Sequence, residues 1–239
     1  MKSFTMALIT TATLFACTKE NEQESQLRLR KITVNGKTHE NFEYTDNGQL
    51  KKDDSYGFCT VPSDEFTYVY KNKRLDSIKS ILRGLYSSSA AVCNPLMGFH
   101  SYAAFEYDNQ GRINKIKKEN STTEYAYNSS AQVEKQTING GGANLYVSTF
   151  KYDIKGNLIE TTDGQGNITH YEFDDKKNPY FLMKRKPDVL IAFYVSPNNV
   201  VKIIPSGGAA VEIRYEYNLL DLPAKMFDPN GLTYTFVYN

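Results

Sequence analysis

A set of aspartates recurs beside aromatic residues or glycines, and these side chains have the most obvious chemical potential. Paired carboxylates could serve as the acid and base of a glycosidase, and clustered ones could bind calcium. Each of them, however, lies where a tight turn favours aspartate, because a short carboxylate accepts hydrogen bonds from the turning backbone. We therefore assign the whole set to turns: Asp108, Asp153, Asp163, Asp174 and Asp228.

Histidine and cysteine offer little support for a metal centre or a nucleophile. None of His39, His100 and His170 has a second histidine at the spacing of zinc ligands. A thiol nucleophile drawn from Cys59 or Cys93 with His100 has no local motif behind it. Phosphate-binding loops and nucleophile elbows are not found in the sequence. We expect no enzymatic activity, no cofactor and no metal site.

Charge and aromatic content narrow the class of protein. The 28 basic and 27 acidic side chains nearly balance, which excludes a surface built to neutralise nucleic-acid phosphates. The 239 residues include 18 Tyr and 13 Phe but no Trp, and these aromatics favour strands. A chain of this length can bury a sizeable core without disulfides or metal.

The N-terminus has the features of an export signal. Lys2 precedes an uncharged stretch, residues 4–16, that is too short to cross a bilayer of about 30 Å. It ends in Leu14-Phe15-Ala16-Cys17, which resembles the lipobox of bacterial lipoproteins. The resemblance implies a signal peptide over residues 1–16 and lipidation of Cys17. An ordinary signal peptide, cut after Ala16 or Ala12, is the alternative.

Residues 17–26 follow as a polar, acidic stretch that predicts a flexible tether. By resemblance to the sorting rule for lipoproteins, Thr18 in place of aspartate favours the outer membrane, on its periplasmic or its surface side. Cys59 and Cys93 remain in the exported chain, either as a disulfide or as two buried thiols.

A short pattern repeats along the rest of the chain: an aromatic residue, Asp or Asn, two variable residues, Gly, one more residue and an aliphatic. The clearest copies are Tyr107-Asp108 with Gly111 and Ile113, and Tyr152-Asp153 with Gly156 and Leu158. Looser copies begin at Tyr44, Tyr70, Tyr127 and Tyr217, the last with Asn218 after the tyrosine and Asp221 in the glycine position.

The residues before each turn alternate, as in Phe105-Glu106-Tyr107, so that both aromatics share one face of a strand. Glycine allows the positive φ of a tight turn, and the aliphatic resumes the same face on the return strand. We therefore predict an all-β antiparallel meander of hairpins over residues 27–239. It would form a single domain, either a twisted sheet or an open barrel-like strip, with one shared apolar seam and phenol tips reaching solvent.

Two segments carry a resemblance to a known repeat. Residues 152–174 include Asp163 and Gly166 after the first turn, and residues 217–239 include Asp228 and Gly231 at the same place. Both segments resemble the Rhs (YD) repeat. The resemblance implies a meandering β shell or scaffold and no chemistry.

Some segments depart from the repeat, and loops on a rigid frame often carry function. Residues 84–98 and 139–142 are loop-like, whereas residues 176–208 contain two apolar runs that we expect to be strands, Val189–Val195 and Val200–Ile204. The tyrosines could stack on sugar rings, although a role in the core is favoured.

The leading hypothesis is an outer-membrane lipoprotein, anchored through lipid, with a non-enzymatic scaffold or binding domain whose ligand is unknown. One alternative is a carbohydrate- or peptide-binding accessory of a nutrient-uptake system. Another is a self-protection lipoprotein of an Rhs-type toxin system. Expected partners are the membrane and a glycan, a peptide or an envelope protein, but not nucleic acid. The oligomeric state is left open.

Overall fold

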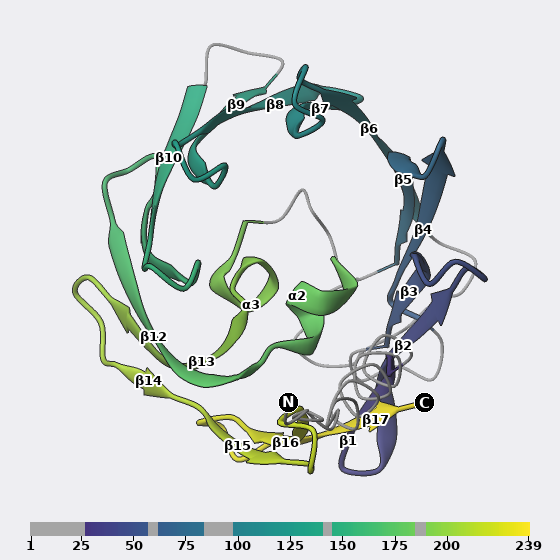
Figure 1. Ribbon diagram of the computed structural model, residues 1–239, viewed down its shortest axis with the longest axis vertical. Helices are drawn as coiled ribbons and strands as arrows, with labels where there is room; N and C mark the ends of the chain where they lie inside the picture. Colours follow the sequence, from purple (N-terminus) through teal and green to yellow (C-terminus); the bar gives the residue numbers. More distant parts are fainter. Residues whose placement is uncertain (1–26, 57–61, 84–97, 141–144, 185–189) are drawn as a thin grey trace, which may run out of the picture.

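A computed structural model describes residues 27–56, 62–83, 98–140, 145–184 and 190–239. Its strands form one antiparallel sheet in which each strand pairs with its neighbours in the chain. Figure 1 shows this sheet curving into a nearly closed ring. The predicted all-β antiparallel meander is therefore confirmed, and the strip bends far enough for its two ends to meet.

The first part of the ring contains the strands β1 (Leu29–Val34), β2 (Lys37–Tyr44), β3 (Leu50–Ser55), β4 (Asp64–Lys71), β5 (Arg74–Leu82), β6 (Phe99–Tyr107), β7 (Ile113–Lys118), β8 (Ser121–Tyr127) and β9 (Val133–Gly140). The second part contains β10 (Leu145–Tyr152), β11 (Leu158–Thr162), β12 (Ile168–Lys177), β13 (Asn198–Pro205), β14 (Val211–Glu212), β15 (Arg214–Tyr217), β16 (Pro223–Phe227) and β17 (Thr233–Tyr238). Ile213 separates β14, which pairs with β13, from β15, which pairs with β16.

One backbone feature recurs around the ring. Tyr107 at the end of β6 pairs with Ile113 at the start of β7, and the register shifts by one residue between Glu106 and Tyr107. Such a bulge increases the local twist of a strand pair. The same aromatic–aliphatic pairing is found at Tyr44–Leu50, Tyr70–Leu75, Tyr127–Val133, Tyr152–Leu158, Phe173–Val200, Tyr217–Pro223 and Tyr238–Leu29.

We call each such pair, with the turn that joins it, a repeat unit. Two of the units are not continuous in sequence. In the Phe173–Val200 unit, the turn is replaced by a long insertion between β12 and β13. In the Tyr238–Leu29 unit, the two halves come from opposite ends of the chain, because β17 pairs with β1. This last unit closes the ring.

The turn after β4 contains two residues with positive φ, Asn72 and Lys73, whereas the turn of each of the other continuous units needs one. Gly111 supplies it at +79°, a conformation that carries little steric penalty for glycine. Ala131 and Asp221 take the same place at +60° and +59°. The backbone conformation of the repeat is therefore kept even where glycine is absent.

The insertion between β12 and β13 lies inside the ring and contains two short helices, α2 (Pro179–Met183) and α3 (Ala192–Val195) (Figure 1). The prediction of a strand over Val189–Val195 is wrong at residues 192–195. Because β12 already pairs with β13, this run has no strand partner, and it buries Ala192 against the sheet instead. Residues 200–204 lie in β13, as expected. Neither described helix is long and apolar enough to cross a lipid bilayer.

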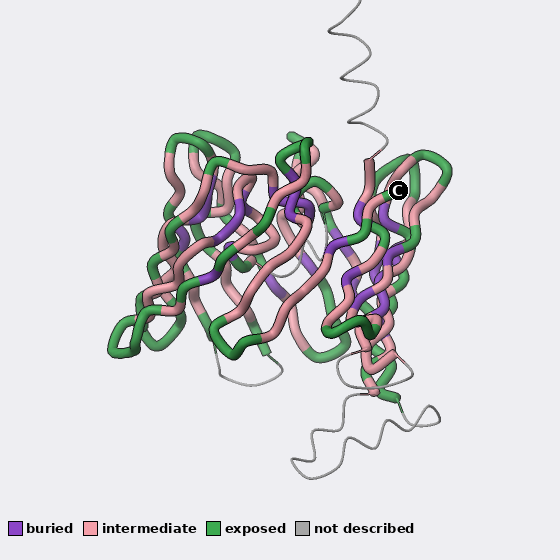
Figure 2. The backbone as a smooth tube through the Cα atoms, turned by 90° about the horizontal axis from the view of Figure 1, so that it is seen from below, coloured by how far each residue is buried: buried purple, intermediate pink, exposed green. Residues whose placement is uncertain are grey.

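Apolar side chains form two buried clusters, not the single seam that we expected. One cluster lies around Ile32, Phe42 and Ile116, and the other around Leu158, Ala192 and Val200. Figure 2 shows buried segments distributed around the ring wall, with exposed turns at both rims. The inserted segment contributes apolar residues to both clusters, Tyr180 and Met183 to the first and Ala192 and Phe193 to the second.

Candidate functional site

The turn aspartates are engaged by the backbone of their own turns. Asp108 Oδ1 accepts hydrogen bonds from the amides of Gln110 and Arg112, both at 2.9 Å. Its Oδ2 accepts a hydrogen bond from Arg112 Nε at 2.7 Å. The same two amide bonds, from the second and the fourth residue onward, are made to Asn128, Asp153, Asp163, Asn218 and Asp228.

These bonds change the acidity of the carboxyl groups. The amide of Arg112, above all, lowers the pKa of Asp108 below its ordinary value. A bond from the Asn167 side chain does the same for the pKa of Asp163. Burial opposes the change at Asp153, but hydrogen bonds led by Asn157 still lower its pKa. Carboxylates that stay ionised in this way are poorly suited to donate a proton to a substrate.

The repeat tyrosines are linked to one another through the backbone. Tyr107 Oη donates a hydrogen bond to the carbonyl of Leu75, the aliphatic of the preceding repeat unit, at 2.6 Å. We call these bonds tyrosine links. They are also made by Tyr44 to Leu29, Tyr70 to Leu50, Tyr127 to Ile113 and Tyr238 to Pro223. These phenol groups therefore bind the preceding repeat unit instead of reaching into solvent, contrary to our expectation.

Burial of these phenols makes them harder to ionise. It raises the pKa of Tyr70 to about 12. It also raises the pKa values of Tyr107, Tyr127 and Tyr238. A protonated phenol is the form that can donate to a carbonyl, so the links persist through neutral pH.

The two ends of the chain reproduce the turn bonds across the split unit. The amide of Asn239 donates to the carbonyl of Arg28 at 3.1 Å, and the amide of Arg28 donates to Asn239 Oδ1 at 2.8 Å. Asp108 and Arg112 make the same two bonds within one turn. Asn239 thus corresponds to Asp108, and Leu29 corresponds to Ile113. The two halves of this unit come from opposite ends of the chain.

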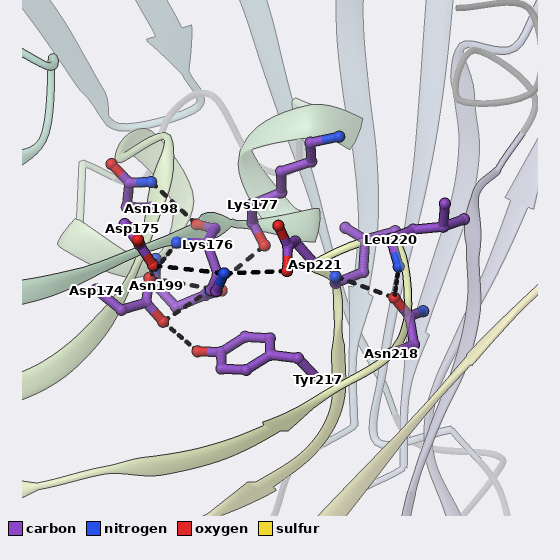
Figure 3. A network of polar contacts seen from close by, with 11 residues as sticks. Asp174, Asp175, Lys176, Lys177, Asn198, Asn199, Tyr217, Asn218, Leu220 and Asp221 are labelled. Atoms are coloured by element: carbon purple, nitrogen blue, oxygen red, sulfur yellow. Dashed lines mark hydrogen bonds and ion pairs between the residues drawn. The ribbon is translucent and has the colours of Figure 1, made fainter. Parts of the chain in front are cut away.

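Asp174 departs from the turn role that we assigned to it, because it lies in β12 and the insertion replaces its turn. Figure 3 shows its carboxylate at the centre of a polar network. Oδ1 accepts hydrogen bonds from the amides of Lys176 and Asn199, both at 3.0 Å, and Oδ2 accepts the Tyr217 hydroxyl. Lys176 in turn pairs with Asp221 at 3.0 Å.

Tyr217 differs from the tyrosines that make the links, because its hydroxyl donates to a side chain in place of a carbonyl. Burial, and then the neighbouring Asp174 carboxylate, raise the pKa of Tyr217 well above its ordinary value. The hydroxyl therefore remains a donor to Asp174 at neutral pH. This contact ties β15 to the point where the insertion leaves the sheet.

Buried asparagines fix the ends of the insertion. Asn178 caps α2 by accepting the amide of Tyr180 at 3.0 Å, and its Nδ2 donates to the carbonyls of Phe193 and Ser196. Asn157 exchanges hydrogen bonds with Asn198, the first residue of β13. Asn178 alone thus satisfies one amide and two carbonyls of the insertion, as buried backbone groups outside a sheet require.

An interior cavity of about 440 Å³ separates the insertion from β7, β8 and β9. Its lining includes Tyr125, Tyr127 and Val133 of the ring wall and Phe181, Leu190 and Tyr194 of the insertion. A mainly apolar lining with a few phenol groups is typical of sites for small ligands.

The histidines are spread over the molecule. His39 packs edge-on against Tyr234, and His170 is 3.6 Å from Glu160. His100 lines a separate cavity of about 620 Å³ with Glu65 and Lys79. Within the described residues, no group of three His, Cys, Asp or Glu is placed to hold a metal ion. Cys17, Cys59 and Cys93, with the proposed lipid and disulfide, lie outside the described residues.

The sequence that forms most of these repeat units matches a known family. The family model for the Teneurin YD-shell matches residues 86–239. The chain belongs to the Teneurin YD-shell family. The resemblance to Rhs (YD) repeats is thereby confirmed, and the domain is a shell-type β scaffold. The units at Tyr44 and Tyr70 precede the matched region but keep the shell geometry.

Solved structures with some likeness to this YD-shell include a toxin and a porin-like protein. The Tc holotoxin pore of Photorhabdus luminescens is 13% identical over 80% of this chain, with a TM-score of 0.36, and this chain spans only 9% of its length. A porin-like protein from Bacteroides uniformis is 13% identical over 88% of this chain and 98% of its own, with a TM-score of 0.42. No curated protein sequence matches the chain.

Sequence reasoning missed the interrupted unit of this YD-shell and the asparagines that support it. One signal was present: Phe173-Asp174 is an aromatic–acid pair with no aliphatic residue at the usual distance, whereas Asn199-Val200 follows much later. Asn178 with Pro179 is a local signal for the start of a helix. The other bonds of Asn178, and those of Asn157 to β13, depend on contacts between distant segments.

Proposed function

We propose that this YD-shell is the folded domain of an outer-membrane lipoprotein and acts there as a non-enzymatic scaffold. The observation that supports the scaffold role is that the polar side chains of the repeat form hydrogen bonds within the shell. Asp108 and its equivalents hold turns, and Tyr107 and its equivalents join neighbouring units. Side chains engaged in this way stabilise the shell and leave few groups for chemistry. The anchor is supported by the Leu14-Phe15-Ala16-Cys17 sequence.

The anchor is tested by labelling cells with a fatty acid. The unaltered chain should incorporate the label and sediment with membranes, whereas Cys17→Ser should lose both properties. Cys59→Ser and Cys93→Ser are matched controls and should keep them. Continued labelling of the Cys17→Ser chain, or no labelling of the unaltered chain, would contradict the anchor. Protease added to intact cells then distinguishes the surface side from the periplasmic side.

The interior cavity supports a second role, the binding of a glycan by aromatic stacking. Tyr125, Tyr194 and Phe181 line a space large enough for a small ligand. Sugar rings have apolar faces and hydroxyl edges, which suit amphipathic aromatic side chains.

A glycan array probed with the full chain tests this second role. Phe181→Ala should abolish binding, because Phe181 lines the cavity, and its 40% exposure means that the fold tolerates the change. Phe99→Ala is the control, since Phe99 is 75% exposed and lies away from the cavity. Failure to bind any polysaccharide, or equal binding by both variants, would argue against a glycan site.

A further inference from the structure

Exposed apolar side chains lie on two turns of the shell that flank the interrupted unit. Ile154 and Leu219 are fully exposed, and Leu220 is 40% exposed. Ile154 lies in the turn after Tyr152, and the two leucines lie in the turn after Tyr217. The interrupted unit connects these turns, because the Lys177 amide donates to the Asp221 carbonyl and Asn198 bonds to Asn157.

The turns themselves do not need apolar residues at these places. These turns are held by hydrogen bonds that backbone amides donate. The amide of Lys155 donates to the Asp153 side chain, and the amide of Leu220 donates to the Asn218 side chain. The corresponding residues of other turns are polar: Asn109 and Gln110, and Ser129 and Ser130. The apolar tips therefore contribute little to the fold and are available to a partner.

The start of the folded chain lies on the same rim as these tips. In an antiparallel meander, alternate turns lie at one edge, and this edge also holds the Asn239–Arg28 contact. We call it the tyrosine rim, and in Figure 2 it is the edge where the C-terminus is marked. Cys17 precedes Leu27 by 27 − 17 = 10 residues, which span at most about 35 Å when extended. The chain enters the shell at the tyrosine rim, so a lipid on Cys17 would hold this rim within about 35 Å of the bilayer.

We propose that the tyrosine rim rests on a phospholipid surface, with Ile154, Leu219 and Leu220 inserted at the level of the headgroups. This inference rests on the proposed anchor at Cys17. Apolar side chains flanked by basic ones are typical of surfaces that lie on membranes. Lys155 follows Ile154, is exposed, and forms no ion pair that the described residues show, so it suits an anionic headgroup.

Because the chain has no tryptophan, single tryptophans can report on each rim. Ile154→Trp and Leu219→Trp probe the tyrosine rim. Gln165→Trp and Asn230→Trp are controls in matching turns of the opposite rim, where their amides bond to Asp163 and Asp228. Each full, lipidated chain is reconstituted in phosphatidylcholine and phosphatidylglycerol vesicles. Tryptophan emission is recorded with and without brominated acyl chains.

We expect a blue shift and at least twofold stronger quenching at 154 and 219 than at 165 and 230. Equal quenching at both rims, or none at 219, would overturn the proposal, as would a blue shift in concentrated protein without vesicles, which would indicate a second copy on the rim. A parallel arm attaches a histidine tag at residue 17 to nickel-chelating lipid. The same emission pattern there would support the rim contact even if natural lipidation at Cys17 failed its own test.

Discussion

Two arcs of the ring use the same repeat unit differently. In the regular arc, β1–β9, repeat tyrosines such as Tyr107 donate to the backbone carbonyl of the preceding unit. In the insertion arc, β10–β16, Tyr217 donates to the carboxylate of Asp174. The difference shows how a shell accommodates an internal segment: a side chain at the entry to the insertion takes the place of a backbone acceptor.

The interrupted and the split units show which part of the repeat is essential. In the regular turn, the Asp108 side chain accepts a hydrogen bond from the amide of Arg112. In the same way, the Asp174 side chain accepts one from the amide of Asn199, and the Asn239 side chain accepts one from the amide of Arg28. In each case the aromatic–aliphatic pair and the hydrogen bond to the Asp or Asn side chain are kept, although the connecting chain differs. The pairing between strands defines the unit, and the connection can be lengthened or cut.

Alkaline pH should have the largest effect, because it acts on what the two arcs share. Burial raises the pKa of Tyr70 in the regular arc and of Tyr152 in the insertion arc to about 12. The folded state therefore keeps protons that the unfolded chain releases near pH 10. Stability should be complete below about pH 10 and be lost as the pH rises toward about 12. Circular dichroism during an alkaline titration checks this, and an unchanged β spectrum above pH 12 would contradict it.

Substitution of Asp174 should affect the insertion arc strongly. Asp174→Ala removes the acceptor for Tyr217 and Asn199, and we expect a loss of about 2–4 kcal/mol in the free energy of unfolding. Asp175→Ala is the control, since the Asp175 side chain is 76% exposed, and it should change stability by less than about 0.5 kcal/mol. Urea denaturation measures both, and similar losses would show that the network does not hold the insertion.

The two kinds of tyrosine contact can be compared by removing one hydroxyl from each arc. Tyr217→Phe loses a bond to a charged group and should cost about 1.5–3 kcal/mol. Tyr107→Phe loses a bond to a neutral carbonyl and should cost about 0.5–1.5 kcal/mol. A double-mutant cycle of Tyr217→Phe with Asp174→Asn isolates the pair. If Tyr107→Phe proves the more damaging change, the distinction between the arcs is wrong.

The smallest effects should come from the residue with positive φ in the regular arc. Gly111→Ala forces an alanine to φ near +79° and should destabilise the fold by about 1 kcal/mol. Ala131→Gly relieves the same strain at φ +60° and should be neutral or stabilising by up to about 1 kcal/mol. Thermal unfolding of the two variants measures the difference. Shifts of the same sign would mean that the turns are not equivalent.

Local features of the fold could be predicted from the sequence because they depend on nearby residues. The Tyr107–Ile113 spacing predicts a hairpin, and Gly111 marks the residue with positive φ. The tyrosine links could not be predicted in this way, since Tyr107 and Leu75 are 32 residues apart and meet only when successive hairpins pair side by side. The helical form of residues 192–195 was missed because a short apolar run fits a strand or a helix equally well.

The network around Asp174 was out of reach of the sequence for a related reason. Its partners Asn199 and Tyr217 lie 25 and 43 residues away, beyond an insertion whose path the repeat pattern does not specify. Closure of the ring likewise depends on Leu29 and Tyr238, which are at opposite ends of the chain. Such contacts are set by the curvature of the whole sheet.

The central claim is that the split unit closes the shell, and amide hydrogen exchange at β1 and β17 tests it most directly. In a closed ring, β1 and β17 are each paired on both edges, so the amides that donate across the junction around the opposed residues Ile32 and Phe236 are protected. We expect them to exchange as slowly as those of Ile116 in β7, a strand paired on both edges. Fast exchange of β1 and β17, at the rate of unpaired edge strands, would show that the ring is open and would contradict the account.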